Sequence, residues 1–354
     1  MRNYRPVFLL VVVLVVAGFC AAQSMVLDIP RQSQHAVVSQ RLGITDITIN
    51  YHRPLVNNRK VWGTLVPYGQ VWRAGANENT TIAFSDPVMI EGKPLEKGTY
   101  GLFMIPTENE WTIIFSRNYT SWGAFTYDQK EDALRVTVKP QASELRNALA
   151  YDFEELKPDS TLVTLRWEKV AVPFKVSVNV PPLVEASLQK QLRSLSQYTW
   201  ISWDEAANYY LDNKLDPQVA LTYADKSIQN EERFENLITK AKALDRLDKK
   251  DEAMAIRNKA FEKGTALQVH FYARGLQGEK RQDEAFAVFR SNAQKYPNVW
   301  VVHTGMARVY CGGGDFDSAV KEMKLAVASA PDPQQKTYLE GLVRRLEAKE
   351  DINK

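Results

Sequence analysis

The chain has 354 residues, of which 45% are hydrophobic, and its Lys and Arg residues nearly balance its Asp and Glu residues, for a formal net charge of +3. This near balance argues against a nucleic-acid-binding protein, which needs a basic surface to replace the counterions of the phosphates. The cysteines, Cys20 and Cys311, are too few for a disulfide-stabilised scaffold, so the fold must depend on hydrophobic cores, and the length is sufficient for two of them.

Residues 1–22 have the features of a secretory signal peptide. These features are a basic start, an apolar run shorter than a membrane-spanning helix, and a small-residue cleavage site: Arg2 and Arg5, residues 7–19, and Cys20-Ala21-Ala22. We expect cleavage after Ala22, which lowers the net charge to +1 and yields a periplasmic or secreted protein. Lipid attachment at Cys20 is the alternative, and the bulky Phe19 before it argues against that interpretation.

Residues 23–180 are predicted to form a β-rich domain. Ile47, Ile49 and Tyr51 alternate with polar residues, as in a half-buried strand, whereas residues 100–105 are apolar on both faces and predict a central strand. Similar short alternations recur at residues 82–84, 111–115, 134–138, 163–167 and 174–178. Strands at this spacing predict an antiparallel β-sandwich or a closed barrel. A short helix is expected at residues 141–150.

Residues 51–80 are the candidate site. Glycines and prolines punctuate this stretch, which predicts an ordered loop, yet it is rich in arginines and aromatic residues. Such a loop is either a well-packed plug or a recognition surface. The candidate ligand-binding residues are His52, Arg53, Arg59, Trp62, Tyr68, Trp72, Arg73 and Asn77.

Arg73 is the most informative of these residues, because Ala74-Gly75-Ala76-Asn77 follows it. Small residues allow a backbone to approach a ligand closely, and a guanidinium and an amide beside them offer directed donors. The alternative is that Arg73 forms an internal ion pair with Asp46 or Glu78. Likewise, Trp62 and Trp72 could simply pack in the core at the open end of the sandwich.

Several motifs in this half resemble, nearly word for word, the family of bacterial domains of unknown function numbered 2911. They occur in order as NNRKVWGTLVPYGQVWRAGANENTTIAF, GKPLEKGTYGLFMIP, WGAFTYDQKEDALRV and LRWEKVAVPFKV. The resemblance covers about 150 residues and implies a β-rich domain secreted by a Gram-negative-type bacterium. It supplies no activity and no catalytic residues. Asn57-Asn58 departs from the family, which usually has Lys-Gly there, so no role of a lysine at this point carries over.

The pattern changes to helical after Pro181-Pro182. Residues 181–198 are predicted to be a linker, residues 199–332 tetratricopeptide-like repeats, and residues 333–354 a capping helix and tail. Small residues recur at three points of a unit of about 34 residues, as two crossing helices require. The matched positions are Asn208, Ala241, Ala273 and Ala307; Ala220, Ala253, Ala285 and Ala319; and Ser227, Ala260, Asn292 and Ala326. The resemblance to the tetratricopeptide repeat implies a protein partner.

No motif for nucleotide, cofactor or metal binding is present, so we expect neither a cofactor nor a metal. The four histidines, His35, His52, His270 and His303, lack partners at metal-ligand spacing. Asp128, Glu131 and Asp132 are acids on a predicted loop, and a solvated run is the simpler interpretation than a glycosidase pair.

These observations favour an exported, non-enzymatic protein. Its β domain would bind a small polar ligand, such as a saccharide or an anion, and its helical repeats would dock a protein partner. Two alternatives stay open: a hydrolase acting on cell-envelope glycan through unidentified acids, and a pure protein scaffold. Paired carboxylates in a cleft would favour the hydrolase, an open pocket with arginine and aromatic residues would favour binding, and a filled loop would favour the scaffold.

Overall fold

The computed structural model describes residues 30–353, so the predicted signal peptide lies outside the described residues. The chain divides into two compact units, the first ending at Val180 and the second beginning at Pro181. Each unit has its own core and is described by itself.

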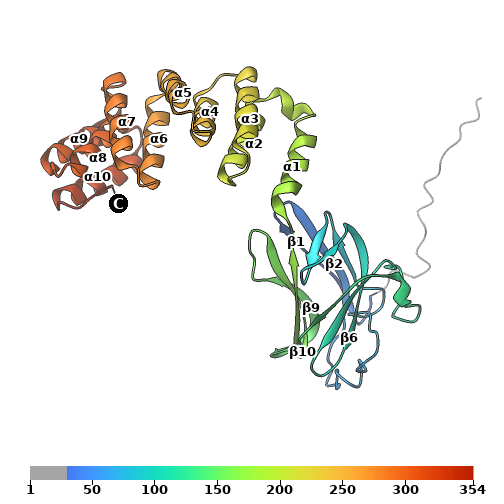
Figure 1. Cartoon of the computed structure of the whole chain (residues 1–354). Coiled ribbons are helices and arrows are strands. Elements are labelled where there is room, and N and C mark those ends of the chain that lie inside the picture. The colour runs from blue at the N-terminus through green and yellow to red at the C-terminus, as the bar shows by residue number, and fades with distance from the viewer. Residues whose placement is uncertain (1–29, 354) are drawn as a thin grey trace, which may run out of the picture. The chain divides into compact units, whose positions relative to one another are not determined.

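The first unit consists of two antiparallel sheets (Figure 1). Its strands are β1 (Gln34–Leu42), β2 (Thr45–Arg53), β3 (Thr81–Phe84), β4 (Val88–Ile90), β5 (Lys93–Leu95), β6 (Gly98–Pro106), β7 (Trp111–Ser116), β8 (Asp132–Val138), β9 (Gln141–Glu154) and β10 (Ser160–Ser177). One sheet has the order β1-β2-β3-β6-β7-β8 and the other β5-β4-β10-β9. The predicted antiparallel β domain is confirmed.

The hydrophobic pattern of the strands explains this arrangement. On β2, Ile47, Ile49 and Tyr51 are buried, while the residues between them are partly or fully exposed. Strand β6 lies between β3 and β7 and is buried along most of its length, as expected of a central strand. Aromatic side chains join the two sheets: the ring centroids of Phe115 and Phe174 are 5.9 Å apart.

The prediction of a short helix at residues 141–150 is wrong, because these residues lie in β9. Strand β9 pairs with β10 along its length, with Ala142 opposite Val170 and Ala150 opposite Arg166. The local sequence has helix-forming residues, but pairing with a long neighbouring strand and burial of Leu149 and Ala150 outweigh that weak preference.

The second unit is a series of helices, with ten α-helices in the described residues (Figure 1). They are α1 (Val180–Gln191), α2 (Trp200–Asp212), α3 (Pro217–Asn230), α4 (Phe234–Arg246), α5 (Lys250–Lys263), α6 (Ala266–Gly278), α7 (Gln282–Lys295), α8 (Trp300–Gly312), α9 (Phe316–Ser329) and α10 (Pro333–Glu347). The segment predicted as a linker therefore contains α1, followed by a 3-10 turn at Leu195–Tyr198. No helix among residues 30–353 is long and apolar enough to span a bilayer.

Helices α2 to α9 form four pairs, each joined by a short turn, and α10 packs on α9. The small residues that define the predicted repeat lie in these helix contacts. Ala220, Ala253, Ala285 and Ala319 all have no exposed surface, and Ala241, Ala273 and Ala307 are at most 1% exposed. The spacing of these small residues and the pairing of the helices make the architecture tetratricopeptide-like.

Two buried repeat positions are polar, Ser227 and Asn292, and each side chain has a hydrogen-bond partner. Ser227 donates its hydroxyl to the carbonyl of Trp200 at 2.7 Å, and Asn292 donates its amide to the carbonyl of Ala266 at 2.8 Å. Both acceptors are the first residues of their helices. The same repeat position therefore makes an equivalent hydrogen bond in two repeats. A buried polar side chain is tolerated where it has such a partner.

Candidate functional site

The loop of residues 54–80 is fixed to the surrounding sheets at several points. Leu55 pairs with Ala148, Trp72 with Met104 and Glu78 with Trp122 in isolated β-bridges. Asn57 and Asn58 adopt left-handed backbone conformations, with φ angles of 48° and 57°. Asparagine tolerates this region better than most residues, which explains how it replaces the usual Lys-Gly.

Four tryptophans form one cluster, two from the loop and two from the strands β7 and β10. The ring of Trp62 lies edge-on to Trp72, Trp111 and Trp167, with centroid distances of 5.8, 4.8 and 5.6 Å. Trp62 is only 8% exposed, so it belongs to the core and cannot form the wall of an open site. Trp72 stacks on Trp167 and is half-buried, and its indole donates to the carbonyl of Gly75 at 3.1 Å.

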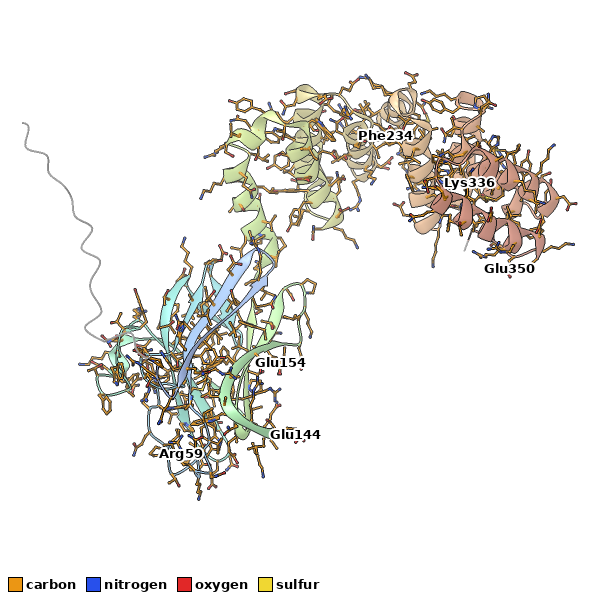
Figure 2. All side chains as sticks on the ribbon, turned by 180° about the vertical axis from the view of Figure 1, so that it is seen from behind. Arg59, Glu144, Glu154, Phe234, Lys336 and Glu350 are labelled. Carbon is orange, nitrogen blue, oxygen red and sulfur yellow. The ribbon has the colours of Figure 1, made fainter. Side chains whose placement is uncertain are left out.

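A cavity of about 290 Å³ opens beside this cluster. The loop supplies most of its lining, including Arg59, Trp72, Arg73 and Asn77, and Ser33 and Trp167 come from distant parts of the chain. Figure 2 shows Arg59 near the end of the β domain, where its side chain is exposed and donates to the carbonyls of Leu55 and Val56. No Asp or Glu of residues 30–353 lines the cavity, so the site is basic.

Arg73 is the unusual residue of this cavity. Its side chain is half-buried, its Nε has no hydrogen-bond partner, and no ion pair of the described residues includes it. Burial lowers the pKa of Arg73, although the group stays charged at neutral pH. A guanidinium removed from water without an anion is unfavourable, because nothing replaces the lost hydration.

Neither expected internal partner forms an ion pair with Arg73 among the described residues. Asp46 faces Arg41 at 3.9 Å, and Glu78 pairs with Arg31 at 3.0 Å. The second carboxylate oxygen of Glu78 lies 3.3 Å from Nε2 of His52, but it is buried and has no hydrogen-bond partner among the described residues. Burial lowers the pKa of His52, although Glu78 opposes this, so the imidazole is neutral at neutral pH. Among the described residues, Arg73 therefore has no internal ion pair.

The turn after Arg73 is held by internal contacts. A side chain at Gly75 would come within 2.4 Å of the Thr80 hydroxyl, so glycine is required by packing at this point. The carbonyl of Ala74 accepts hydrogen bonds from Thr80 and from Tyr151. Asn77 donates its amide to the carbonyl of Ser33 at 3.2 Å. The small residues thus serve a rigid turn, which fixes the position of Arg73.

The other candidate residues either have a structural role or lie outside the lining of the cavity. Arg53 donates from Nε to the carbonyl of Leu149 at 2.8 Å and so fastens β2 to β9. Tyr68 is 39% exposed and does not line the cavity. His52 also lies outside the lining, with its ring 5.2 Å from that of His35. The structure brings Arg59, Trp72, Arg73 and Asn77 together, but not His52, Arg53, Trp62 or Tyr68.

Two of the three acids singled out in the sequence have structural roles. Asp128 caps a 3-10 turn at Gln129–Glu131, and Asp132 accepts hydrogen bonds from Tyr127 and Arg135. Within residues 30–353, no group of three or more His, Cys, Asp or Glu residues could hold a metal ion. His303 is engaged with Glu322 at 2.7 Å.

Comparison with known proteins identifies the first unit. Residues 33–176 match the family described as "Protein of unknown function (DUF2911)", so the chain carries a DUF2911 domain. No curated protein matches the chain.

Among solved structures, the chain is similar to YrrB, described as "a TPR protein with an unusual peptide-binding site". The identity is 17% and the TM-score 0.27, over 44% of this chain and 81% of that chain. It is also similar to the APC/C hetero-tetramer Cut9-Hcn1, at 16% identity and a TM-score of 0.29, over 49% of this chain and 37% of that chain.

Proposed function

We propose that this chain, which carries a DUF2911 domain followed by tetratricopeptide-like repeats, is an exported interaction protein without catalytic activity. The cavity of the β domain binds a small molecule with an anionic group, carried by a saccharide or another polar compound. The helical repeats dock a protein partner. The features of a signal peptide in residues 1–22 support export.

The observation that carries the ligand proposal is Arg73. Its guanidinium is half-buried on a rigid turn, faces a cavity without acidic residues, and lacks an anionic partner among the described residues. An anion that entered the cavity would supply the missing charge and accept a charge-assisted hydrogen bond. The half-buried Trp72 beside it offers a flat apolar surface for the body of the ligand.

The two alternative functions have less support. A hydrolase needs paired carboxylates facing one cleft, and the described residues that line this cavity include none. A pure scaffold needs a filled loop, and the loop leaves a cavity of about 290 Å³, at the small end of the range for ligand sites.

The test is a thermal-shift screen of the chain from Gln23 onward against matched pairs of compounds. Each pair joins an acid to its neutral counterpart, such as glucuronate with glucose and lactate with glycerol. A ligand stabilises the native state in proportion to the logarithm of its concentration over its Kd. We expect shifts with members of the acidic series, none with their neutral twins, and loss of the shifts in Arg73→Ala. Equal shifts with both members of a pair would refute an anion-binding cavity.

A further inference from the structure

The last repeats contain a cavity of about 690 Å³ between α6, α8 and α10. His270, Phe271 and Arg274 line it from α6, and Arg308 lines it from α8. Asp332, at the start of α10, is the one acid among the described residues of the lining, and its Oδ1 already accepts from the backbone of Gln335 at 2.9 Å. The lining therefore contains two guanidinium groups and one carboxylate.

Arg308 is the more deeply buried of the two arginines. It is 3% exposed, and its Nε has no hydrogen-bond partner among the described residues. One Nη donates to the carbonyl of Ile352, a neutral acceptor in the chain's own tail. Burial lowers the pKa of Arg308 to about 10, and the like charge of Arg274 contributes.

Arg274 also lacks a carboxylate partner among the described residues. Its Nη1 donates to Oε1 of Gln277 at 2.6 Å, which is again a neutral group. The ion pairs found among residues 30–353 include neither arginine, so two positive charges share this cavity and no carboxylate of the described residues binds either guanidinium.

His270 adds a second unsatisfied polar group. It is 5% exposed, its ring packs 5.1 Å from that of Phe289, and its Nδ1 has no partner in the described part of the chain. Burial, with the nearby charge of Arg308, lowers the pKa of His270 to about 3, so the ring is neutral at physiological pH. A neutral imidazole donates one hydrogen bond and accepts one, and a hydrogen bond with the backbone of Val301 already engages the ring of His270. Buried polar atoms without partners are rare in native proteins, and they mark places where a ligand can supply one.

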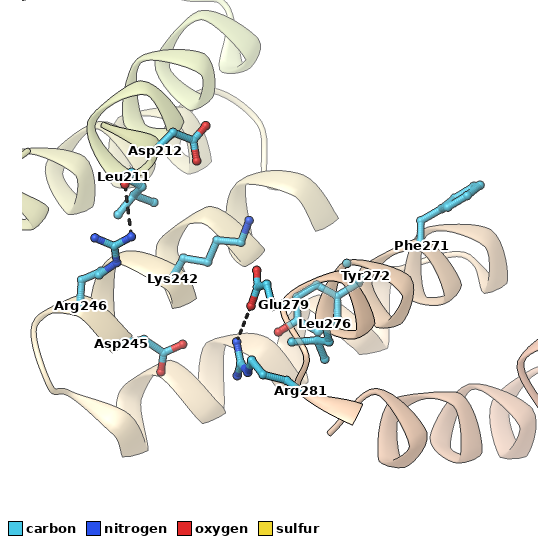
Figure 3. A pocket seen from close by; sticks show the side chains of 11 residues that line it. Leu211, Asp212, Lys242, Asp245, Arg246, Phe271, Tyr272, Leu276, Glu279 and Arg281 are labelled. Atoms are coloured by element: carbon cyan, nitrogen blue, oxygen red, sulfur yellow. Dashed lines mark hydrogen bonds and ion pairs between the residues drawn. The ribbon is translucent and has the colours of Figure 1, made fainter. Parts of the chain in front are cut away.

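The neighbouring cavity of the repeats provides a contrast. It has a volume of about 500 Å³ and is lined by residues of α2, α4, α6 and the turn after α6 (Figure 3). Its lining contains three basic and three acidic residues: Lys242, Arg246 and Arg281, and Asp212, Asp245 and Glu279. Arg281 pairs with Glu279 at 3.0 Å, as Figure 3 shows. The charge imbalance therefore distinguishes the cavity of the last repeats from its neighbour.

We propose that the cavity between α6, α8 and α10 binds an acidic side chain of an extended peptide segment from a protein partner. The carboxylate bridges Arg274 and Arg308, and the buried ring of His270 lines the cavity beside them. Phe271 and Tyr338, which are 63% and 60% exposed on the rim, contact an apolar residue beside the acid. Charge complementarity decides the occupant, because a neutral or basic segment would leave both guanidinium groups uncompensated. This inference rests on the proposal that the repeats dock a protein.

The test uses the chain from Gln23 onward and an array of short fluorescent peptides of acidic, neutral and basic character. Every acidic peptide has an amide twin in which Glu or Asp is replaced by Gln or Asn, and binding is measured by fluorescence anisotropy. The variants are Arg274→Gln and Arg308→Met, with Arg290→Gln, an exposed arginine on α7, as the matched control. Because Arg308 is buried and its variant could unfold, the half-buried Arg274 provides an independent readout.

We expect acidic peptides with an apolar neighbour to bind at least about tenfold more tightly than their amide twins. Arg274→Gln should remove most of this difference, while Arg290→Gln leaves it unchanged. Equal binding of acidic and amide twins, or preference for neutral or basic peptides, would overturn the charge-specific site but leave docking by the repeats intact. Absence of binding by any peptide would overturn both.

Discussion

Replacing Arg73 by Ala separates a binding residue from a structural one without knowledge of the ligand. The change breaks no ion pair and no hydrogen bond found among residues 30–353. It removes two half-buried methylene groups, each worth about 0.8 kcal/mol when fully buried. It also removes a buried Nε without a partner, a group whose burial costs about 1–3 kcal/mol. These two effects oppose each other, so the free energy of unfolding should change by less than about 1 kcal/mol.

The matched control is Arg166→Ala in the same domain. Arg166 donates to both carboxylate oxygens of Glu154, at 2.7 and 2.9 Å, and both side chains are about a third exposed. Burial alone would raise the pKa of Glu154, but the hydrogen bonds from Arg166 and Thr164 outweigh it and lower the pKa. Truncation of Arg166 leaves the carboxylate without its main partner, at a cost of about 1–3 kcal/mol.

The assay is urea denaturation of wild type and both variants without added ligand, with the transition followed by tryptophan fluorescence. We expect Arg166→Ala to lower the midpoint clearly and Arg73→Ala to leave it nearly unchanged, with equal m values in all three proteins. A loss of about 3–5 kcal/mol in Arg73→Ala would show that the guanidinium compensates a buried charge, and would refute its role in the cavity.

Three further predictions concern the repeats and processing. Ala285→Leu inserts bulk into a helix contact with no exposed surface and should destabilise the helical unit by about 1–3 kcal/mol; an unchanged melting temperature would refute the repeat register. The pKa of His270 is about 3 in the folded chain and 6.5 for an ordinary exposed histidine, so the unfolded chain binds more protons between these values. Stability should therefore fall as pH drops below 6.5, by up to about 1.4 kcal/mol per pH unit, and His270→Gln should lose this component; identical pH profiles would contradict the burial of the ring. The proposed cleavage predicts a mature protein with the mass of a chain beginning at Gln23, and a diacylglycerol adduct at Cys20 would show lipid anchoring instead.

Much of the fold could be predicted because local patterns and tertiary contacts agree. The alternation at Ile47, Ile49 and Tyr51 and the repeating alanines mark the buried faces directly. Strand β9 could not be predicted from its own residues, because its conformation depends on the eighteen-residue strand β10 beside it. Propensity is a weak guide where a long-range partner supplies the hydrogen bonds.

The candidate site could be located as a stretch but not resolved into roles. Arg53 and Arg73 are both candidate ligand-binding residues in the sequence, yet Arg53 fastens Leu149 and Arg73 faces a cavity. That difference depends on which carbonyls and carboxylates distant strands bring close to each arginine. The same limit applies to Arg308 in the repeats, because only the folded chain shows that its charge is buried beside Arg274 without an anion from the described residues.

The central claim is that an anionic ligand binds to Arg73. The most direct measurement is an NMR titration of the arginine Nε–H signals with the most stabilising acid of the compound panel. The Nε–H of Arg53 is already bonded to the carbonyl of Leu149, so it serves as an internal reference. We predict that the Arg73 signal moves with ligand concentration, because its Nε gains a partner, while the Arg53 signal stays in place. An Arg73 signal that does not move at saturating ligand, or a panel in which no acid binds, would contradict the account.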